Sequence, residues 1–230
     1  MKTYAIILAS GTGNRFGGDL PKQFTEIAGK TILERSIEVF EGVNGVNGID
    51  SIILVITPEY KELAEEIVKK NNYKKVSKII EGGKLRKDSS YNGVFSIEEN
   101  EANILIHDCA RPFISADVIK NCIKALETHN AVGVAIPSTD TIIEVNNEII
   151  KNIPPRDTLM RVQTPQCFKL SLIKKAHELS KNDTDFTDDC GLVLKHNLAD
   201  IFVVKGNREN IKITYPEDII LANIYAKGSL

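Results

Sequence analysis

The chain has 230 residues, 42% of them hydrophobic, and carries a formal net charge of −2 at pH 7. This length suffices for one domain with a sizeable core, and the near-neutral charge, with no basic block interleaved with aromatic residues, argues against nucleic-acid binding. The first apolar run is far too short for a signal peptide, and no later run approaches a membrane span. We therefore expect a soluble, cytoplasmic protein that binds neither membrane nor nucleic acid.

The first predicted strand, residues 4–8, leads into a glycine-containing loop, Leu8-Ala9-Ser10-Gly11-Thr12-Gly13-Asn14-Arg15-Phe16, which continues to Pro21-Lys22-Gln23-Phe24. The two glycines let backbone N–H groups approach an anion closely, and Arg15 and Lys22 add full positive charges. Neither familiar glycine motif fits, because the Walker pattern is absent and Phe16 stands where the dinucleotide fingerprint has its third glycine. The loop is suited to wrapping a polyphosphate, although glycines needed only for turn geometry are the plain alternative.

Strand-length apolar runs alternate with segments of helical period along the first half of the chain. The predicted strands cover residues 4–8, 51–57, 76–80, 104–107 and 132–136, and the helices between them cover residues 32–40, 59–70, 89–98 and 116–126. Several strands are β-branched and continuously apolar, which is typical of parallel strands covered on both faces. The alternation predicts an α/β fold with a doubly wound, mainly parallel sheet.

A β-hairpin is predicted after Pro137, with strands at residues 141–145 and 148–153 around the turn pair Asn146-Asn147. A hairpin that projects from an α/β body cannot bury both its faces alone. We therefore expect one domain over residues 1–230, with a β-arm at about residues 138–160 that forms a homodimer. Further helices at 171–179 and 188–195, a strand at 199–204 and a helix opened by Pro216 complete the chain.

Polar clusters follow two of the predicted strands at their carboxyl ends, where open parallel sheets bind ligands. The first, Gly82-Gly83-Lys84-Leu85-Arg86-Lys87-Asp88-Ser89, suits the base, ribose or phosphate of a nucleotide. The second, His107-Asp108-Cys109-Ala110-Arg111-Pro112, offers Asp108 as a ligand for a magnesium ion that bridges phosphates. Taken singly, each cluster is also consistent with a turn cap, an ion pair or a solvated helix start.

The cysteines are Cys109, Cys122, Cys167 and Cys190, with no Cys-x-x-Cys pair and no histidine at metal-ligand spacing. Reduced, mostly buried thiols are expected. Cys109 follows His107 and Asp108, but neighbours on a strand point to opposite faces, which disfavours a nucleophilic dyad.

Ordered blocks from Ile6 to Asp218 resemble the cytidylyltransferase branch of the sugar-phosphate nucleotidyltransferases. They are Leu-Ala-Ser-Gly-Thr-Gly-Asn-Arg, Pro-Lys-Gln-Phe, Gly-Gly-x-x-Arg-x-x-Ser, His-Asp-x-Ala-Arg-Pro, Asp140-Thr141-Ile142, Arg156-x-x-Leu-x-x-x-Gln-Thr-Pro-Gln, Thr187-Asp188-Asp189 and Asn210-Ile211-Lys212-Ile213-Thr214. The resemblance is closest to the 2-C-methyl-D-erythritol 4-phosphate cytidylyltransferases of isoprenoid biosynthesis. The chain is also similar to the ribitol-5-phosphate cytidylyltransferases.

The resemblance implies a Rossmann-like enzyme that transfers CMP from CTP to a polyol phosphate with Mg²⁺ and releases pyrophosphate. It implies nucleotide binding by Leu8, Ala9, Ser10, Gly11, Gly83, Lys84, Arg86 and Ser89. It implies catalytic roles for Arg15, Lys22, Arg156 and Lys212, and substrate contacts for Asp108, Arg111, Thr141, Thr164 and Thr187, with Asp108 also on the metal. Family members are dimers whose arm carries the equivalents of Thr141 and Arg156 into the neighbour's site.

Local features favour methylerythritol phosphate as the acceptor, among them the short spacing from Arg15 to Pro21 and Val162 before Gln163. Ile153-Pro154 before Arg156 is instead typical of the ribitol enzymes, which make CDP-ribitol for capsule or teichoic-acid polymers. Ribitol 5-phosphate is therefore the alternative acceptor. A non-catalytic nucleotide-binding relative is the alternative of another class.

Overall fold

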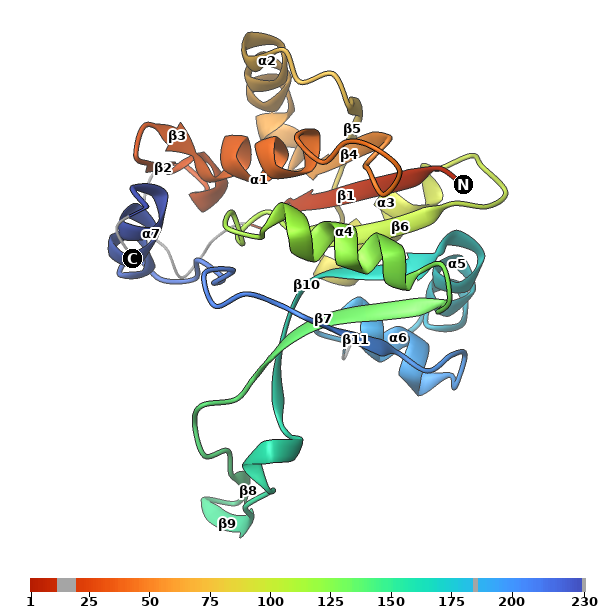
Figure 1. The fold of residues 1–230 in the computed structure, drawn as a ribbon, viewed down its shortest axis with the longest axis vertical. Helices are drawn as coiled ribbons and strands as arrows, with labels where there is room; N and C mark the ends of the chain where they lie inside the picture. Colours follow the sequence, from red (N-terminus) through yellow and green to blue (C-terminus); the bar gives the residue numbers. More distant parts are fainter. Residues whose placement is uncertain (12–19, 184–185, 229–230) are drawn as a thin grey trace.

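The computed structural model describes residues 1–11, 20–183 and 186–228, and a seven-stranded sheet forms its centre (Figure 1). The strands lie in the order β11 (Phe202–Lys205), β7 (Ala131–Pro137), β10 (Met160–Lys169), β6 (Asn103–Asp108), β1 (Thr3–Ala9), β4 (Ser51–Ile56) and β5 (Val76–Glu81). All neighbouring pairs are parallel except those of β10, which runs antiparallel to β6 and β7. The predicted fold class, a mainly parallel α/β sheet, is confirmed.

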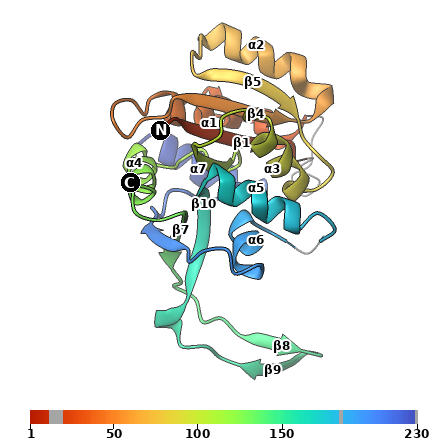
Figure 2. The same cartoon turned by 90° about the vertical axis from the view of Figure 1, so that its right-hand side faces the viewer.

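Helices cover both faces of this sheet, as Figures 1 and 2 show. One face carries α1 (Ile32–Glu41), α2 (Lys61–Asn71), α4 (Ala116–Ala125) and α7 (Asp218–Ala226), and the other carries α3 (Arg86–Phe95), α5 (Leu170–Leu179) and α6 (Asp189–Lys195). Strand β1 contributes Ile7 to the first core and Ile6 to the second, because successive side chains of a strand alternate. Burial on both faces explains why the parallel strands are apolar throughout.

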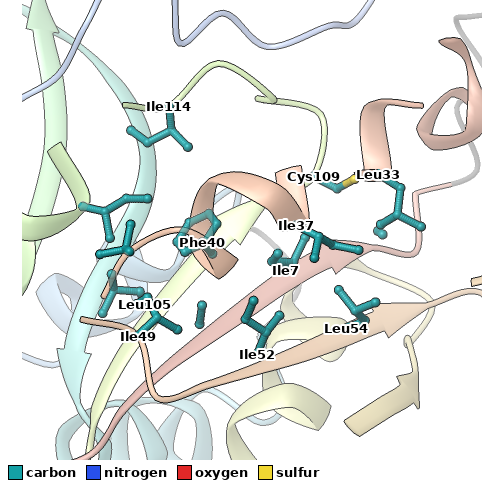
Figure 3. Packing of buried hydrophobic residues seen from close by; sticks show 14 of the residues in the cluster. Ile7, Leu33, Ile37, Phe40, Ile49, Ile52, Leu54, Leu105, Cys109 and Ile114 are labelled. Carbon is teal, nitrogen blue, oxygen red and sulfur yellow. The ribbon is translucent and has the colours of Figure 1, made fainter. Parts of the chain in front are cut away.

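Helix α1 anchors the larger core (Figure 3). Its Ile37 and Phe40 are fully buried in the cluster that also contains Ile7 of β1. The helix begins at a capping box, in which the Thr31 side chain accepts from the Glu34 N–H and the Glu34 carboxylate accepts from the Thr31 N–H. Helix α4 begins at an N-cap, Ser115, whose hydroxyl accepts from the Val118 N–H.

The arm begins after β7 and projects from the body (Figure 1). Its hairpin pairs β8 (Glu144–Asn146) with β9 (Ile149–Asn152), and every residue of both strands is exposed. The turn lies at Asn147 and Glu148, with φ of 49° and 62°, one residue later than predicted. Asn146 pairs with Ile149, which leaves Asn147 and Glu148 as the two central residues of the turn. A two-residue turn of this kind requires both central residues to be left-handed. Short elements flank the site and arm: η1 (Lys22–Phe24), β2 (Glu26–Ile27), β3 (Lys30–Thr31), η2 (Pro58–Tyr60) and η3 (Arg156–Thr158).

Within the central sheet, the sequence pattern did not predict strand β10, and the short strands β2 and β3 outside that sheet were not predicted either. The middle of β10 is the polar block Gln163-Thr164-Pro165-Gln166, and its pairing with β7 shifts register between Gln163 and Gln166. A proline and an irregular register remove the apolar alternation by which strands are recognised. Other differences are boundary shifts: α3 begins at Arg86 and not at residue 89, residues 59–70 divide between η2 and α2, β11 begins at Phe202, and α7 begins at Asp218.

Over the described ranges, no helix combines the length and apolarity needed to cross a membrane.

Candidate active site

A cavity of about 520 Å³ opens where β1 and β6 end, the edge at which parallel sheets bind ligands. The pairing of Leu8 with Asp108 sets the loops that follow these two strands side by side. The cavity is lined by all the residues expected to hold the nucleotide: Leu8, Ala9, Ser10, Gly11, Gly83, Lys84, Arg86 and Ser89. Lys22, Asp108 and Lys212 also line it. Arg15 lies outside the described residues.

The two loops expected to hold the nucleotide, residues 8–11 and 82–89, are joined through serine hydroxyls; we call them the nucleotide loops. Ser10 Oγ lies 2.7 Å from Ser89 Oγ, and the Gly83 N–H donates to Ser89 Oγ at 3.1 Å. A Cβ on Gly82 would stand 2.3 Å from the Cβ of Ser10, so only glycine permits this approach. A Cβ on Gly11, in contrast, would meet no described atom within 4 Å.

The Pro-Lys-Gln block places a cation on the cavity wall. Gln23 Nε2 donates to the Ala9 carbonyl at 2.7 Å, which ties η1 to the end of β1. Lys22 Nζ donates to the Ile213 carbonyl at 2.8 Å, directly beside Lys212 in the chain. Two lysines that are far apart in the sequence thus line the same cavity.

Asp108, at the end of β6, is buried between two cations. Arg86 Nε donates to its Oδ1 at 3.0 Å, and Lys212 Nζ donates to its Oδ2 at 2.8 Å. Burial alone would raise the pKa of Asp108, but the charges of Arg86 and Lys212 outweigh burial and hold that pKa well below its usual range. The carboxylate is therefore ionised throughout the physiological range.

A relay of hydrogen bonds fixes the backbone of Asp108. Its N–H donates to Thr164 Oγ1 at 3.1 Å, Thr164 Oγ1 lies 3.0 Å from His107 Nδ1, and His107 Nε2 lies 3.0 Å from the Arg111 carbonyl. Because a carbonyl can only accept, we assign the ring proton to Nε2, and Nδ1 then accepts from the Thr164 hydroxyl. Burial lowers the pKa of His107 to about 4, so the ring is neutral at pH 7. Thr164 is consequently buried on the side of Asp108 that faces away from the cavity, and it does not line the cavity.

Arg86 also binds a second carboxylate, from α6. Its Nη1 donates to Oδ2 of Asp189 at 2.7 Å, and Oδ1 of the fully buried Asp189 accepts from Ser90 Oγ at 2.5 Å. Burial disfavours the charge of Arg86, but Asp189 and Asp108 outweigh it and raise the pKa of the guanidinium. Nη2 of Arg86 is buried without a hydrogen-bond partner among the described residues.

The sequence reasoning missed the network that holds Asp189. Gln166 Oε1 accepts from the Asp189 N–H at 2.7 Å and from the Cys190 N–H at 3.1 Å, while Gln166 Nε2 donates to Asp188 Oδ2 at 2.9 Å. The Thr-Asp-Asp block was visible as a motif, but nothing in the sequence indicated that its second acid reaches Arg86. Gln163 similarly binds the loop before Lys212, by donating to the carbonyls of Asn207 and Asn210.

The remaining expected site residues do not line the cavity of this chain. Arg111 donates to the carbonyls of Asn210, at 2.9 Å, and Val162, at 3.3 Å. Thr141 and Arg156 are exposed on the arm, where Arg156 Nη1 donates to the Thr139 carbonyl at 3.5 Å. Thr187 is exposed just before α6.

Asp108 fits a magnesium site that is completed by the substrate. In the described ranges, no group of three or more His, Cys, Asp or Glu residues is placed to hold a metal ion. Magnesium is commonly bound through one or two carboxylates together with substrate phosphates, so a single carboxylate at a polyphosphate cavity matches its needs. Both oxygens of Asp108 are engaged by cations, and metal binding therefore requires Arg86 or Lys212 to turn away.

Comparison with known proteins gives one consistent family. The family model "IspD: 2-C-methyl-D-erythritol 4-phosphate cytidylyltransferase" matches residues 3–227. A 2-C-methyl-D-erythritol 4-phosphate cytidylyltransferase from Thermosipho melanesiensis is 41% identical over 223 residues, which cover 96% of each chain. A crystal structure of 4-diphosphocytidyl-2C-methyl-D-erythritol synthase from Anaerococcus prevotii superposes with a TM-score of 0.86 at 30% identity, and the match covers 98% of this chain and 96% of that one.

A relative of the ribitol type is equally similar. The bifunctional ribulose 5-phosphate reductase/CDP-ribitol pyrophosphorylase Bcs1 from Haemophilus influenzae is 42% identical over 229 residues. The match covers 96% of this chain but only 48% of Bcs1, so the chain spans about half the length of that relative.

Proposed function

The chain belongs to the 2-C-methyl-D-erythritol 4-phosphate cytidylyltransferase (IspD) family, and we propose that it transfers CMP from CTP to a polyol phosphate. The observation that carries the proposal is the joint lining of one cavity by the two nucleotide loops, Lys22, Lys212 and the Asp108–Arg86 pair. A triphosphate needs fixed cations and backbone donors, and this cavity offers both.

The reaction is an in-line displacement at the α-phosphorus of CTP. A phosphate oxygen of the acceptor forms the new P–O bond, the bond to the β-phosphate breaks, and pyrophosphate leaves. The acceptor phosphate is already ionised near neutral pH, so no general base is needed, and positioning with charge stabilisation supplies the catalysis. Lys22 and Arg15 stabilise the charge on the transferred phosphorus, and Lys212 holds the incoming phosphate.

Magnesium would be held by Asp108 together with phosphate oxygens of CTP. When bound, it neutralises charge on the triphosphate. Asp108 would release Arg86 or Lys212, and a released Lys212 is free to bind the acceptor's phosphate. Nη2 of Arg86 then contributes a donor to the nucleotide.

The acceptor side is completed by a second copy of the chain. Thr141 and Arg156 stand on an arm that projects from the body and does not line the cavity of its own chain, and the arm exposes apolar side chains that a partner would cover: Ile142, Ile143, Val145, Ile149, Ile150 and Ile153. In this proposal residues 1–230 form one domain, and the arm at about residues 138–160 forms the homodimer contact. Thr187 and Arg111 support the binding of the acceptor. A cytoplasmic location is consistent with the free, buried thiols of all four cysteines.

The acceptor we favour is 2-C-methyl-D-erythritol 4-phosphate, because the family model and the T. melanesiensis relative carry that name. D-ribitol 5-phosphate is the second candidate, supported by the 42% identity to Bcs1. Pyrophosphate release from CTP and Mg²⁺ with each acceptor in turn tests both. We expect release with at least one acceptor and none without acceptor. No release with either would contradict the proposed activity, and the outcome for a non-catalytic relative would be CTP binding without turnover.

A further inference from the structure

The first turn of α3 carries two adjacent cations that reach opposite ends of one loop. Arg86 pairs with Asp189, where the loop ends and α6 begins. Lys87 reaches the start of the same loop, at residues 180–183. Between these ends lies Thr187, which we placed on the acceptor side.

The ammonium of Lys87 is bound by backbone carbonyls that lie just beyond the C-terminus of α5. Nζ donates to the carbonyl of Ser180 at 2.8 Å, to that of Asp183, and at 3.4 Å to that of Lys181. Helix α5 ends at Leu179, so these carbonyls lie next to the negative end of the helix dipole, and the Ser180 carbonyl also accepts from the Asp183 N–H at 3.0 Å. An ammonium has three donors, so these three carbonyls satisfy it fully.

The other side-chain contacts described for residues 180–183 come from α6 and from His196, which follows it. Lys195 pairs with Asp183 at 2.8 Å, and Ser180 Oγ lies 2.9 Å from His196 Nε2. The Lys195–Asp183 pair is largely solvated, with side-chain exposures of 47% and 30%, so it contributes little. Among the described residues, Lys87 links residues 180–183 to the loop that precedes α3.

The far end of the loop is also anchored. Asp188 caps α6 by accepting from the Gly191 N–H at 2.9 Å, and its other oxygen binds Gln166. Before it, the ring of Phe186 lies 5.1 Å below Lys195 Nζ. The neighbours of Thr187 are therefore held in place while its own side chain remains exposed, so the position of Thr187 depends on these anchors.

We propose that Lys87 is a positioning residue for the acceptor: it ties the segment that bears Thr187 to the nucleotide loop. This inference rests on the proposed function. Lys87 does not line the cavity, and the contacts that shape the nucleotide side, Ser10–Ser89 and Arg86–Asp108, do not involve its ammonium. Loss of the ammonium should therefore weaken acceptor binding selectively.

The test is Lys87→Met, which keeps the aliphatic stem and removes the charge. The matched control is Lys78→Met, because Lys78 also donates to a carbonyl, that of Ser96 at 2.6 Å, but from the edge strand β5. For Lys87→Met we expect the KM of the polyol phosphate to rise about tenfold, equal to 1.4 kcal/mol. The CTP Kd from calorimetry should stay within about twofold, and kcat within about threefold. Lys78→Met should match the wild type. Lys87→Arg, which keeps a cation able to donate to the carbonyls, should restore the KM to within about threefold.

An unchanged acceptor KM in Lys87→Met would overturn the proposal, and so would a CTP Kd that rises in parallel, since that result indicates general destabilisation. Amide hydrogen exchange of residues 180–191 provides a readout without turnover. We expect faster exchange there in Lys87→Met and not in Lys78→Met, and equal exchange would refute the anchoring role. A wild type that releases no pyrophosphate with either acceptor refutes the proposed function instead, so the two failures are distinguishable.

Discussion

Replacing Thr164 by valine tests whether this residue supports Asp108 or contacts the acceptor directly. The hydroxyl accepts from the Asp108 N–H at 3.1 Å and hydrogen-bonds to His107 Nδ1 at 3.0 Å. Valine has nearly the same shape but no hydroxyl, so Thr164→Val leaves two buried polar groups without partners.

The magnitude follows from the cost of unpaired buried groups. Each costs about 1–3 kcal/mol, and the hydroxyl itself is lost from a site that is only 4% exposed. We expect Thr164→Val to lower the free energy of unfolding by about 3 kcal/mol. For a chain of this size, that corresponds to a decrease in Tm of roughly 6–12 °C.

Urea unfolding followed by circular dichroism measures this change, and Thr164→Ser is the control because it retains the hydroxyl. The serine variant should lose no more than about 1 kcal/mol, the value of a buried methyl group. In the valine variant the KM values of CTP and acceptor should change together, because displacement of Asp108 affects both. Wild-type stability combined with a raised KM for the acceptor alone would refute the reasoning and show that Thr164 contacts the acceptor.

Four further predictions concern the charged centre, its histidine and the arm. The pKa of His107 is about 4 in the folded protein, against an ordinary value of 6.5, so between these pH values the unfolded chain binds one more proton than the folded chain. The free energy of unfolding should therefore fall by up to about 3 kcal/mol as the pH drops from 6.5 to 4. Urea titrations of the wild type and of His107→Gln measure this pH dependence, which should be smaller in the variant. Lys22→Met should reduce kcat by about 10²- to 10³-fold with an unchanged thermal melt, and near-normal turnover would remove Lys22 from the mechanism. Asp189→Asn leaves Arg86 with one carboxylate and should raise the CTP Kd by about tenfold, the scale of a hydrogen bond between charged groups; calorimetry giving wild-type affinity would contradict the positioning of Arg86 by Asp189. Ile150→Asp places a charge on the exposed arm and should give a monomer by light scattering with impaired turnover, whereas an active monomer would separate the arm from catalysis.

Most of the sheet was predictable because its strands satisfy a local rule. β1 and β4 are buried on both faces, so their sequences are apolar at every position and need no knowledge of their neighbours to be recognised. Strand β10 follows no such rule, since its centre is polar and contains Pro165. β10 becomes a strand because the backbone N–H and C=O groups along the facing edges of β6 and β7 need hydrogen-bond partners, and β10 supplies them.

The candidate site divides in the same way. Lys22, Arg86 and Asp108 follow strand ends, so their approach to one cavity could be predicted from the topology of a parallel sheet. Thr164 could be singled out as part of a motif, but its place behind Asp108 depends on where β10 enters the sheet. Asp189 and Lys87 could not be predicted as buried contact residues, because charged side chains are equally common at solvent-exposed helix ends.

The sequence by itself therefore determined the α/β architecture, the glycine-containing loops at the strand ends and the cations that follow the strands, because burial on two faces and glycine at close approaches leave local marks in the chain. Only the tertiary structure decided that Arg86 is held between Asp108 and Asp189, that His107 is neutral, and that Lys87 binds the end of α5. Those contacts join residues that are distant in the chain, and their energies depend on burial and distance, which no local pattern specifies.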